Sequence, residues 1–570
     1  MMAQALPQHL RKYVVQQNYD KYTPVDQACW RFVMRQLKAF LSTHAHECYL
    51  EGLKKTGIEI EKIPRIDDIS KKLEQFGWRA LPVSGFIPPA AFMELQSLSV
   101  LPIASDMRAI SHLMYTPAPD IVHEAAGHAP ILVDPEFAQY LKEYAQVAKK
   151  AIISDEDLRV YEAIRRLSDV KENPNSTDKD VAQAQQNLDQ VISQTSHASE
   201  ATELSRMNWW TAEYGLIGDL KNPKIFGAGL LSSVGESKWC LSDKVKKIPL
   251  TLDCIHMSYD ITEPQPQLFV AKDFQTLTKV LHELADTMAF RQGGLEGIKK
   301  AIRAKTVNTV QLDSGIQISG QCTEVLTNSE NNKPIYLKFQ GPVQLSYQDQ
   351  ELPGQGSKYH SQGYGTAIGP LKSHSTQQLQ ALVDTKVRLE YLSGVVVEGV
   401  LKSVLEKQNH LLLLGFDQCT VQYQNQVLFE PAWGTYDLAM GLEVTSVFGG
   451  PADRASYGDL DDFVAARVPE PKYTTEQLQK FSLYQKVRDL RDQKIQGIQL
   501  ESELQSVLNA ADKDFSKDWL LRLESYELIL ARAPDSELKN QLSERLSTLS
   551  KELGPEGMLI ADGLSLADQL

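Results

Sequence analysis

The chain has 570 residues, and its 59 Lys and Arg against 73 Asp and Glu give a formal net charge of −14. This acidic balance disfavours a protein that binds nucleic acid or an anionic membrane surface, because such surfaces favour clustered Lys and Arg. Hydrophobic residues at 42% and charged residues at 23% are ordinary for a soluble globular protein. The length predicts about three or four domains, and the composition fits an enzyme that acts on small molecules.

The N-terminal part of the chain is expected to be mainly helical. Over residues 1–75 the apolar residues recur at helical spacing, and Thr23 followed by proline is typical of a helix start. A second short helix is predicted over 66–76. Residues 82–92 read P-V-S-G-F-I-P-P-A-A-F, and so much Pro and Gly predicts an irregular segment. Helix is expected to return over 120–150.

Residues 148–207 carry two polar helical segments around the run S-D-V-K-E-N-P-N-S-T-D-K-D. This pattern predicts a solvated helical hairpin inserted into a compact domain. We expect a peripheral position for it rather than a part in chemistry.

The amino-acid composition changes near residue 305, where β-branched residues, Gln and Gly become frequent. Hairpins are predicted over 387–401 and 421–429, because apolar and polar residues alternate on either side of turn residues. The helical period returns after Pro471 with a capping-box pattern from Thr474 to Gln477. We therefore expect three parts: a mainly α catalytic domain over 1–305 with the 148–207 insertion, a β-rich domain over 306–455, and a helical C-terminal region over 456–570.

The six cysteines are scattered and form no C-x-x-C pair, which disfavours a disulfide framework or a thiolate zinc site and favours a reducing cytoplasm. The first residues lack the apolar core of a signal peptide. No stretch approaches the roughly 20 apolar residues that span a bilayer. We expect a cytoplasmic protein that does not enter a membrane.

The segment Y-T-P-A-P-D-I-V-H-E-A-A-G-H-A-P places His123 and His128 five residues apart. Zinc proteases of the H-E-x-x-H type space their histidines by four, which puts both on one helix face. Five residues turn the second histidine about 140° from the first on an ideal α-helix. Both could reach one metal if the helix distorts near Gly127. A carboxylate could then complete a 2-His-1-carboxylate triad, and the candidate is Glu213 in N-W-W-T-A-E-Y-G-L. Ordinary surface or core histidines remain an alternative.

This segment resembles the signature of the pterin-dependent aromatic amino acid hydroxylases, Y-T-P-x-P-D-x-x-H-E-x-x-G-H. Four further blocks resemble the family in the same order. They are F-G-W-R-A-L-P-V-S-G-F-I at the pterin loop, W-W-T-A-E-Y-G-L with the glutamate ligand, F-G-A-G-L-L-S-S-V-G-E, and Y-D-I-T-E-P-Q-P-Q-L-F-V. The blocks fall within residues 20–300 and are most like the bacterial, phenylalanine-hydroxylating members. The resemblance implies the aromatic amino acid hydroxylase fold for the catalytic domain.

By this resemblance His123, His128 and Glu213 bind Fe(II), and Glu124 faces the pterin. A tetrahydropterin, such as tetrahydrobiopterin, would lie against Gly85, Phe86, Ile87 and Phe92. Arg108 would hold the substrate carboxylate. The remaining substrate-pocket positions are Thr116, Pro117, Pro119, Trp209, Tyr214, Gly229 and Ser232. Three residues depart from the family pattern: Pro88 and Pro89 stand where small polar residues are usual, and Asn208 stands where an aromatic is common.

The resemblance implies hydroxylation of L-phenylalanine to L-tyrosine with O2 and a tetrahydropterin. Trp209 is the residue expected of phenylalanine hydroxylases, and Ile261 stands where tyrosine hydroxylases carry Asp. A tryptophan hydroxylase of the same family is the alternative, since those enzymes also carry an aliphatic residue at that position. A zinc metalloprotease is the alternative from another class, and a binding or scaffold role is open for the C-terminal half. Two features of length also differ from the family: His128 and Glu213 lie about twice as far apart as usual, and the chain before the catalytic region is too short for the sensing domain of animal enzymes.

Overall fold

The computed structural model describes residues 6–83, 87–114, 119–172, 176–261, 263–373, 375–458 and 472–569. Within these ranges the chain packs as two compact units, each assembled from separate stretches. The first unit comprises Lys12–Glu143, Asn208–Leu277 and Val464–Leu570, and the second comprises Met1–Arg11, Tyr144–Met207 and Thr278–Phe463. This grouping cuts across the three consecutive parts expected from the sequence, so those parts remain a prediction about domains.

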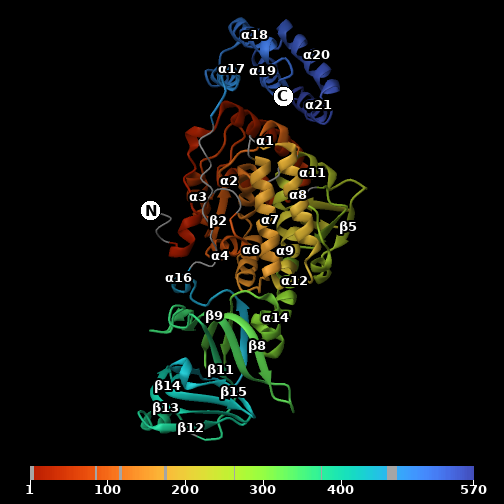
Figure 1. Ribbon diagram of the computed structural model, residues 1–570. Coiled ribbons are helices and arrows are strands. Elements are labelled where there is room, and N and C mark those ends of the chain that lie inside the picture. The colour runs from red at the N-terminus through yellow and green to blue at the C-terminus, as the bar shows by residue number, and fades with distance from the viewer. Residues whose placement is uncertain are drawn as a thin grey trace. The chain divides into compact units, whose positions relative to one another are not determined.

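The first unit carries the helices and short strands around the predicted metal ligands (Figure 1). Its helices are α1 (Pro24–His44), α2 (Cys48–Thr56), α3 (Ile66–Leu73), α4 (Pro89–Ser97), α5 (Ala129–Ile131), α10 (Ala228–Leu231) and α11 (Val234–Trp239), with the π-helical turns η6 (Val122–His128) and η7 (Trp209–Glu213). The helices α6 (Pro135–Ala148) and α12 (Phe274–Thr287) cross its boundaries.

Two small sheets accompany these helices. β1 (Arg79–Val83) and β2 (Val100–Ala104) run parallel. The other sheet has the order β4-β3-β6-β5, in which β3 and β5 both run parallel to β6 and β4 is antiparallel to β3. Its strands are β3 (Leu216–Asp219), β4 (Asn222–Ile225), β5 (Lys246–Pro249) and β6 (Gln267–Ala271).

Local sequence explains the helix starts in this unit. The Thr23 side chain accepts the Asp26 N–H and Asp26 accepts the Thr23 N–H, so α1 opens on a capping box with proline at its first position. The predicted helix over 66–76 is confirmed as α3 followed by a tighter turn. The irregular segment expected over 82–92 is partly wrong. β1 extends through Val83, and α4 begins at Pro89, where the missing N–H of proline costs no helical hydrogen bond.

The C-terminal helices belong to the first unit and pack against α1. They are α17 (Thr475–Asp492), α18 (Gly497–Asp514), α19 (Trp519–Arg532), α20 (Glu537–Glu552) and α21 (Glu556–Ala567), coloured blue in Figure 1. The predicted capping box at Thr474 is confirmed. Phe32 of α1 meets Trp519 edge to face with ring centroids 5.1 Å apart. Buried Arg31 of α1 donates from Nε to buried Glu524 of α19 at 2.9 Å.

The second unit contains the predicted helical hairpin. Its helices α7 (Asp155–Glu172) and α8 (Asp178–Ser193) pack through Ala163, Leu167, Ala184 and Leu188. α9 (Glu200–Asn208) follows, and α13 (Ala289–Gln292) and α14 (Gly294–Ala304) lead into the strands. Buried Glu200 joins these parts, because it accepts the N–H groups of Ile152 and Ala289 and the ammonium of Lys300.

Two antiparallel sheets make up the rest of the second unit. One contains β7 (Asn308–Leu312), β8 (Ile316–Thr327), β9 (Pro334–Tyr347), β10 (Gln350–Glu351), β11 (Gly363–Ala367) and β17 (Val444–Gly449). The other contains β12 (Lys386–Glu390), β13 (Val395–Lys407), β14 (His410–Tyr423), β15 (Gln426–Phe429) and β16 (Tyr436–Ala439). Both predicted hairpins are confirmed, as β12–β13 and β14–β15. The short helix α16 (Arg454–Tyr457) follows β17 along the chain.

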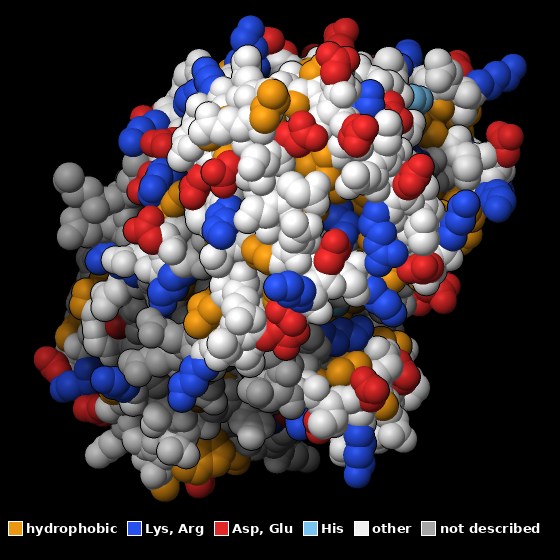
Figure 2. All heavy atoms as spheres, turned by 90° about the horizontal axis from the view of Figure 1, so that it is seen from above, with side chains coloured by type: hydrophobic (Ala, Val, Ile, Leu, Met, Phe, Trp, Pro, Cys, Tyr) orange, Lys and Arg blue, Asp and Glu red, His pale blue; other side chains and the backbone are white. Residues whose placement is uncertain are grey.

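The surface drawn in Figure 2 mixes basic and acidic side chains at short intervals, with hydrophobic side chains in small separate groups. Such a mixed surface has no broad field of one sign. Among the described residues, the helices are all too short or too polar to cross a bilayer.

Candidate metal centre

Three side chains of the first unit converge as the sequence predicted. His123 Nε2 lies 3.3 Å from Glu213 Oε2, and His128 Nε2 lies 3.3 Å from Glu213 Oε1. The two imidazole Nε2 atoms are 3.3 Å apart. Each residue offers one ligand atom, and these atoms lie within 4.8 Å of one another. Two imidazoles and one carboxylate in this arrangement match the donor set of a 2-His-1-carboxylate centre.

The two histidines reach one point because η6 is a π-helix. Its hydrogen bonds join residues five apart, as from the Ala129 N–H to the Glu124 carbonyl. Residues five apart therefore come round to nearly the same side, which an α-helix would not allow. Gly127 contributes through close packing, since a Cβ there would lie 2.6 Å from the Ala228 carbonyl oxygen.

Glu213 is also carried by a π-helical turn. In η7 the Tyr214 N–H donates to the Trp209 carbonyl five residues earlier at 2.8 Å. Asn208, one of the departures from the family pattern, donates from Nδ2 to Glu213 Oε1 at 3.3 Å. Such turns are frequent at functional sites. Here η6 carries the two histidine ligands, and η7 carries the glutamate.

Ser232 fixes the orientation and tautomer of His123. The Ser232 hydroxyl donates to the Ala228 carbonyl at 2.7 Å and lies 3.2 Å from His123 Nδ1. Because its proton is directed to that carbonyl, the hydroxyl accepts a hydrogen bond from Nδ1–H. The Nε2 lone pair of His123 then faces Glu213 and is free for a metal, as in many metal-bound histidines.

The pKa values of two carboxyl groups in the site are shifted in opposite directions. Burial acts to raise the pKa of Glu213, but His128 and His123 outweigh it and hold that pKa well below its usual range. Burial raises the pKa of Glu124 to about 8. Glu124 Oε2 lies 4.0 Å from His128 Nε2 and has no hydrogen-bond partner among the described residues. An acceptor left open in this way fits a ligand with an N–H group.

Arg108 is held by Asp120 beside the ligand helix. Its Nε and Nη2 donate to the two carboxylate oxygens of Asp120, each at 2.7 Å, and Nη1 donates to the Ser232 carbonyl at 3.1 Å. Asp120 also accepts the His123 N–H at 3.0 Å. Among the described residues these bonds use one hydrogen on each Nη atom, which leaves one on each for a further acceptor. Asp120 was missed by the sequence analysis, although it stands within the signature segment.

Trp209 lies in a stack of aromatic rings. Its ring centroid is 4.4 Å from that of Tyr214 and 4.3 Å from that of Tyr259, with interplanar angles of 22° and 8°. Stacking against two rings at these distances holds the indole in a fixed orientation. Trp209 Nε1 is buried and has no hydrogen-bond partner in the described parts of the chain. The Tyr214 hydroxyl donates to Glu236 at 2.8 Å.

The other predicted positions are only partly described. Ile87 is buried, and Phe92 and Pro119 are half-buried. Gly229 packs on the ligand segment, since a Cβ there would lie 2.8 Å from the Tyr214 ring and 3.1 Å from the Glu213 carbonyl. The predicted pterin-loop residues Gly85 and Phe86 and the substrate-pocket residues Thr116 and Pro117 lie outside the described residues.

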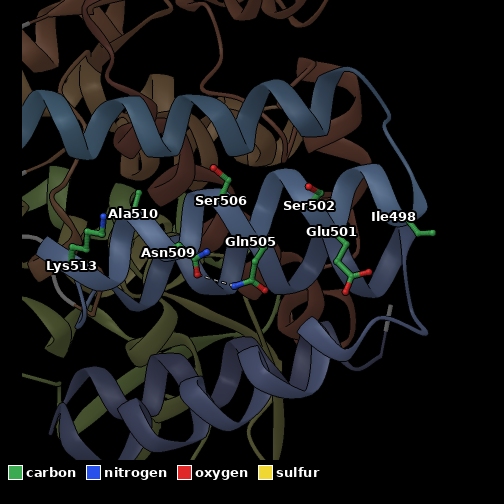
Figure 3. A pocket seen from close by; sticks show the side chains of 8 residues that line it. All are labelled: Ile498, Glu501, Ser502, Gln505, Ser506, Asn509, Ala510 and Lys513. Carbon is green, nitrogen blue, oxygen red and sulfur yellow. Dashed lines mark hydrogen bonds between the residues drawn. The ribbon is translucent and has the colours of Figure 1, made fainter.

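A separate hollow runs along one face of α18 (Figure 3). It is lined by side chains such as Glu501, Gln505 and Asn509, and Gln505 donates to Asn509 at 3.0 Å. Nothing among its lining side chains resembles a catalytic or ligand set, so the metal centre remains the candidate site.

The comparison with known families agrees with this geometry. Residues 11–162 and 172–293 match the family described as biopterin-dependent aromatic amino acid hydroxylase. The matched residues, just under half of the chain, are thus similar to that family. The break in the match, residues 163–171, falls within α7 of the helical hairpin. All of the described strands of the two large sheets and all of the described C-terminal helices lie beyond the match.

The chain is also similar to proteins named phenylalanine-4-hydroxylase. The chain is 30% identical over 272 residues to a phenylalanine-4-hydroxylase of Dictyostelium discoideum, covering 47% of this chain and 52% of that protein. It is 29% identical over 285 residues to a phenylalanine-4-hydroxylase of Pseudomonas aeruginosa, covering 49% of this chain and 90% of that protein. The chain thus spans about half the length of the eukaryotic relatives it matches.

Among solved structures, phenylalanine hydroxylase of Chromobacterium violaceum with bound iron(III) and 7,8-dihydrobiopterin is similar at 25% identity and a TM-score of 0.37. The similarity covers 48% of this chain and 88% of that one.

Proposed function

We propose that this protein hydroxylates L-phenylalanine to L-tyrosine, using O2 and a tetrahydropterin at a non-haem Fe(II). The observation that carries the proposal is the convergence of His123, His128 and Glu213 within 4.8 Å, inside a segment that matches the hydroxylase family. The named relatives, which are phenylalanine-4-hydroxylases, support the same substrate.

The residues present fit a ferrous ion. Ser232 leaves the Nε2 atom of His123 free, and Glu213 stays ionised between two imidazoles. Three protein ligands leave positions open on an octahedral metal. When bound, iron and the reduced pterin together supply the activation of dioxygen. The chain itself supplies three metal-ligand side chains, and the two π-helical turns hold them in a fixed geometry.

The residues present also fit a pterin on the Glu124 side of the metal. Glu124 is buried, and its Oε2 atom has no partner in the described part of the chain. A carboxyl group in this state binds an N–H group of a planar ring and so orients it. The half-buried Phe92 at the start of α4 is proposed to offer an aromatic face to the same ring.

The substrate is proposed to bind through its carboxylate and its ring. The remaining hydrogens on the Nη atoms of Arg108 suit a carboxylate, and the Asp120 pair keeps the guanidinium from rotating. Trp209, stacked against two tyrosines, offers a rigid contact to the aromatic ring. Ile261, half-buried two residues after Tyr259, supports phenylalanine over tyrosine. The scattered free cysteines support a cytoplasmic location.

Product identification tests the proposal. Full-length protein is loaded anaerobically with Fe(II) and then given tetrahydrobiopterin, O2 and one of phenylalanine, tyrosine or tryptophan. We expect tyrosine from phenylalanine as the main product. Hydroxylated tryptophan as the main product would favour the alternative substrate within the family, and no product from any of the three would contradict the proposal. The zinc-protease alternative has no support from the family match.

A further inference from the structure

A second group of metal-ligand side chains lies in the first unit, apart from the iron ligands. His46, Cys48 and Asp134 each offer one ligand atom, and these atoms lie within 4.8 Å of one another. His46 Nδ1 is 3.1 Å from Cys48 Sγ. Zinc ligands stand about 2.0–2.3 Å from the ion, so two ligands of a tetrahedral site are about 3.3–3.8 Å apart. The distance between His46 Nδ1 and Cys48 Sγ is slightly below this range, and small side-chain shifts would bring the three atoms onto one ion.

The backbone holds these side chains in place without a metal. His46 lies in the turn between α1 and α2, and its N–H donates to the Ile225 carbonyl at 2.8 Å. Asp134 precedes α6, where its Oδ1 accepts the N–H groups of Glu136 and Phe137 at 2.9 and 3.1 Å. A carboxylate fixed by capping a helix loses little further freedom on binding a metal.

Cys48 differs from the other cysteines of the chain. It is half-buried, whereas the other five are buried. Thiolate, imidazole and carboxylate together form a donor set that suits Zn²⁺, and three of them leave a fourth position for water. The absence of C-x-x-C pairs disfavours sites with several thiolates, but it does not address a single thiolate combined with His and Asp.

We propose that His46, Cys48 and Asp134 form a second divalent-metal site, of the zinc type, with a structural role. The site would join the α1–α2 turn to the segment that follows the iron ligand His128. α2 and α5 already pack closely there, since a Cβ on Gly52 would lie 2.0 Å from the Pro130 carbonyl oxygen. Metal at this site therefore stabilises the helices on both sides of that contact.

The test uses full-length protein carrying one equivalent of iron, titrated anaerobically with Co²⁺ as a spectroscopic probe of a zinc site. We expect one further equivalent to bind and to give a thiolate-to-cobalt charge-transfer band, while the iron content stays constant. The iron site has no sulfur ligand, so the band reports the second site alone. Zn²⁺ should abolish the band and raise the melting temperature of the iron-loaded protein.

Variants separate a built site from chance binding. Cys48→Ser should remove the band, and Asp134→Asn, which keeps a good helix cap, should weaken Co²⁺ binding by about tenfold or more. Glu47→Gln, an exposed neighbour outside the ligand set, should bind as the wild type does. Absence of the thiolate band in the wild type would overturn the proposal. So would unchanged Co²⁺ affinity in Asp134→Asn, whose folding is checked by circular dichroism without added metal.

Discussion

Ser232 Oγ lies 3.2 Å from His123 Nδ1, and the opposite ring nitrogen of His123 faces Glu213. Removing this hydroxyl by Ser232→Ala frees the imidazole to rotate and to change tautomer. We expect the affinity for Fe(II) to fall by about 10- to 100-fold, measured by anaerobic titration. Ser237→Ala is the matched control, because this buried hydroxyl bonds only the Val234 carbonyl among the described residues. Equal affinity in wild type and Ser232→Ala would show that the hydroxyl does not position the ligand.

Gly127 sits in the π-helical turn between the two histidine ligands. A Cβ in Gly127→Ala would meet the Ala228 carbonyl oxygen at 2.6 Å, so one of the two backbone segments must move. We expect the free energy of unfolding to fall by about 1–3 kcal/mol, together with loss of bound iron. Gly235→Ala serves as control, since among the described residues its Cβ would make only ordinary contacts, with the Met114 methyl group at 3.4 Å and the Met114 carbonyl oxygen at 3.7 Å. Its stability should stay within about 1 kcal/mol of wild type. Chemical denaturation of the wild type and of both variants measures these free energies of unfolding.

Arg31 and Glu524 form a buried ion pair between α1 and α19, and Arg491 also donates to Glu524 at 3.3 Å. Glu524→Ala would leave the guanidinium groups of buried Arg31 and half-buried Arg491 without this partner. We expect a loss of about 3–5 kcal/mol in unfolding free energy. Asp562→Asn breaks the half-exposed pair with Lys238 and should cost no more than about 1 kcal/mol. Similar losses in the two variants would mean that the C-terminal helices do not depend on the buried network.

His360 gives the second unit a predictable dependence on pH. Burial lowers the pKa of His360 from 6.5 to about 4, and its Nε2 lies 2.7 Å from Gln355 Oε1. Between these two values the unfolded chain binds a proton that the folded chain does not, so the free energy of unfolding falls as pH falls from about 6.5 to about 4. Below about 4 this residue adds no further slope. In His360→Gln the free energy of unfolding should change less with pH over this range, as measured by denaturation at several pH values. A variant with the wild-type pH profile would contradict this assignment.

The sequence predicted the ligands better than it predicted how they meet. His123, His128 and Glu213 were found from the signature segment and the family resemblance, and the structure brings them together. The π-helical turns were not predicted, because their hydrogen-bond pattern depends on tertiary contacts such as the packing of Gly127 on Ala228. Helix caps at Thr23 and Thr474 were predictable because the bonds involved are local.

Contacts between residues far apart in the sequence could not be predicted from local sequence patterns. Asp120 was passed over although it lies in the signature, since its role appears only when Arg108 closes on it. The stacking of Tyr259 on Trp209 joins residues 50 positions apart. Likewise, the packing of the C-terminal helices on α1 depends on Arg31 and Glu524, which are nearly 500 residues apart in sequence (493 positions).

The central claim is that His123, His128 and Glu213 hold one ferrous ion. The most direct test measures iron per chain after anaerobic loading and removal of excess metal, in wild type, Glu213→Ala and Glu124→Gln. Glu124 is an adjacent buried carboxyl that the account places outside the ligand set. We expect about one equivalent of iron in wild type and in Glu124→Gln, and a large loss in Glu213→Ala. Full iron content in a folded Glu213→Ala protein would contradict the account.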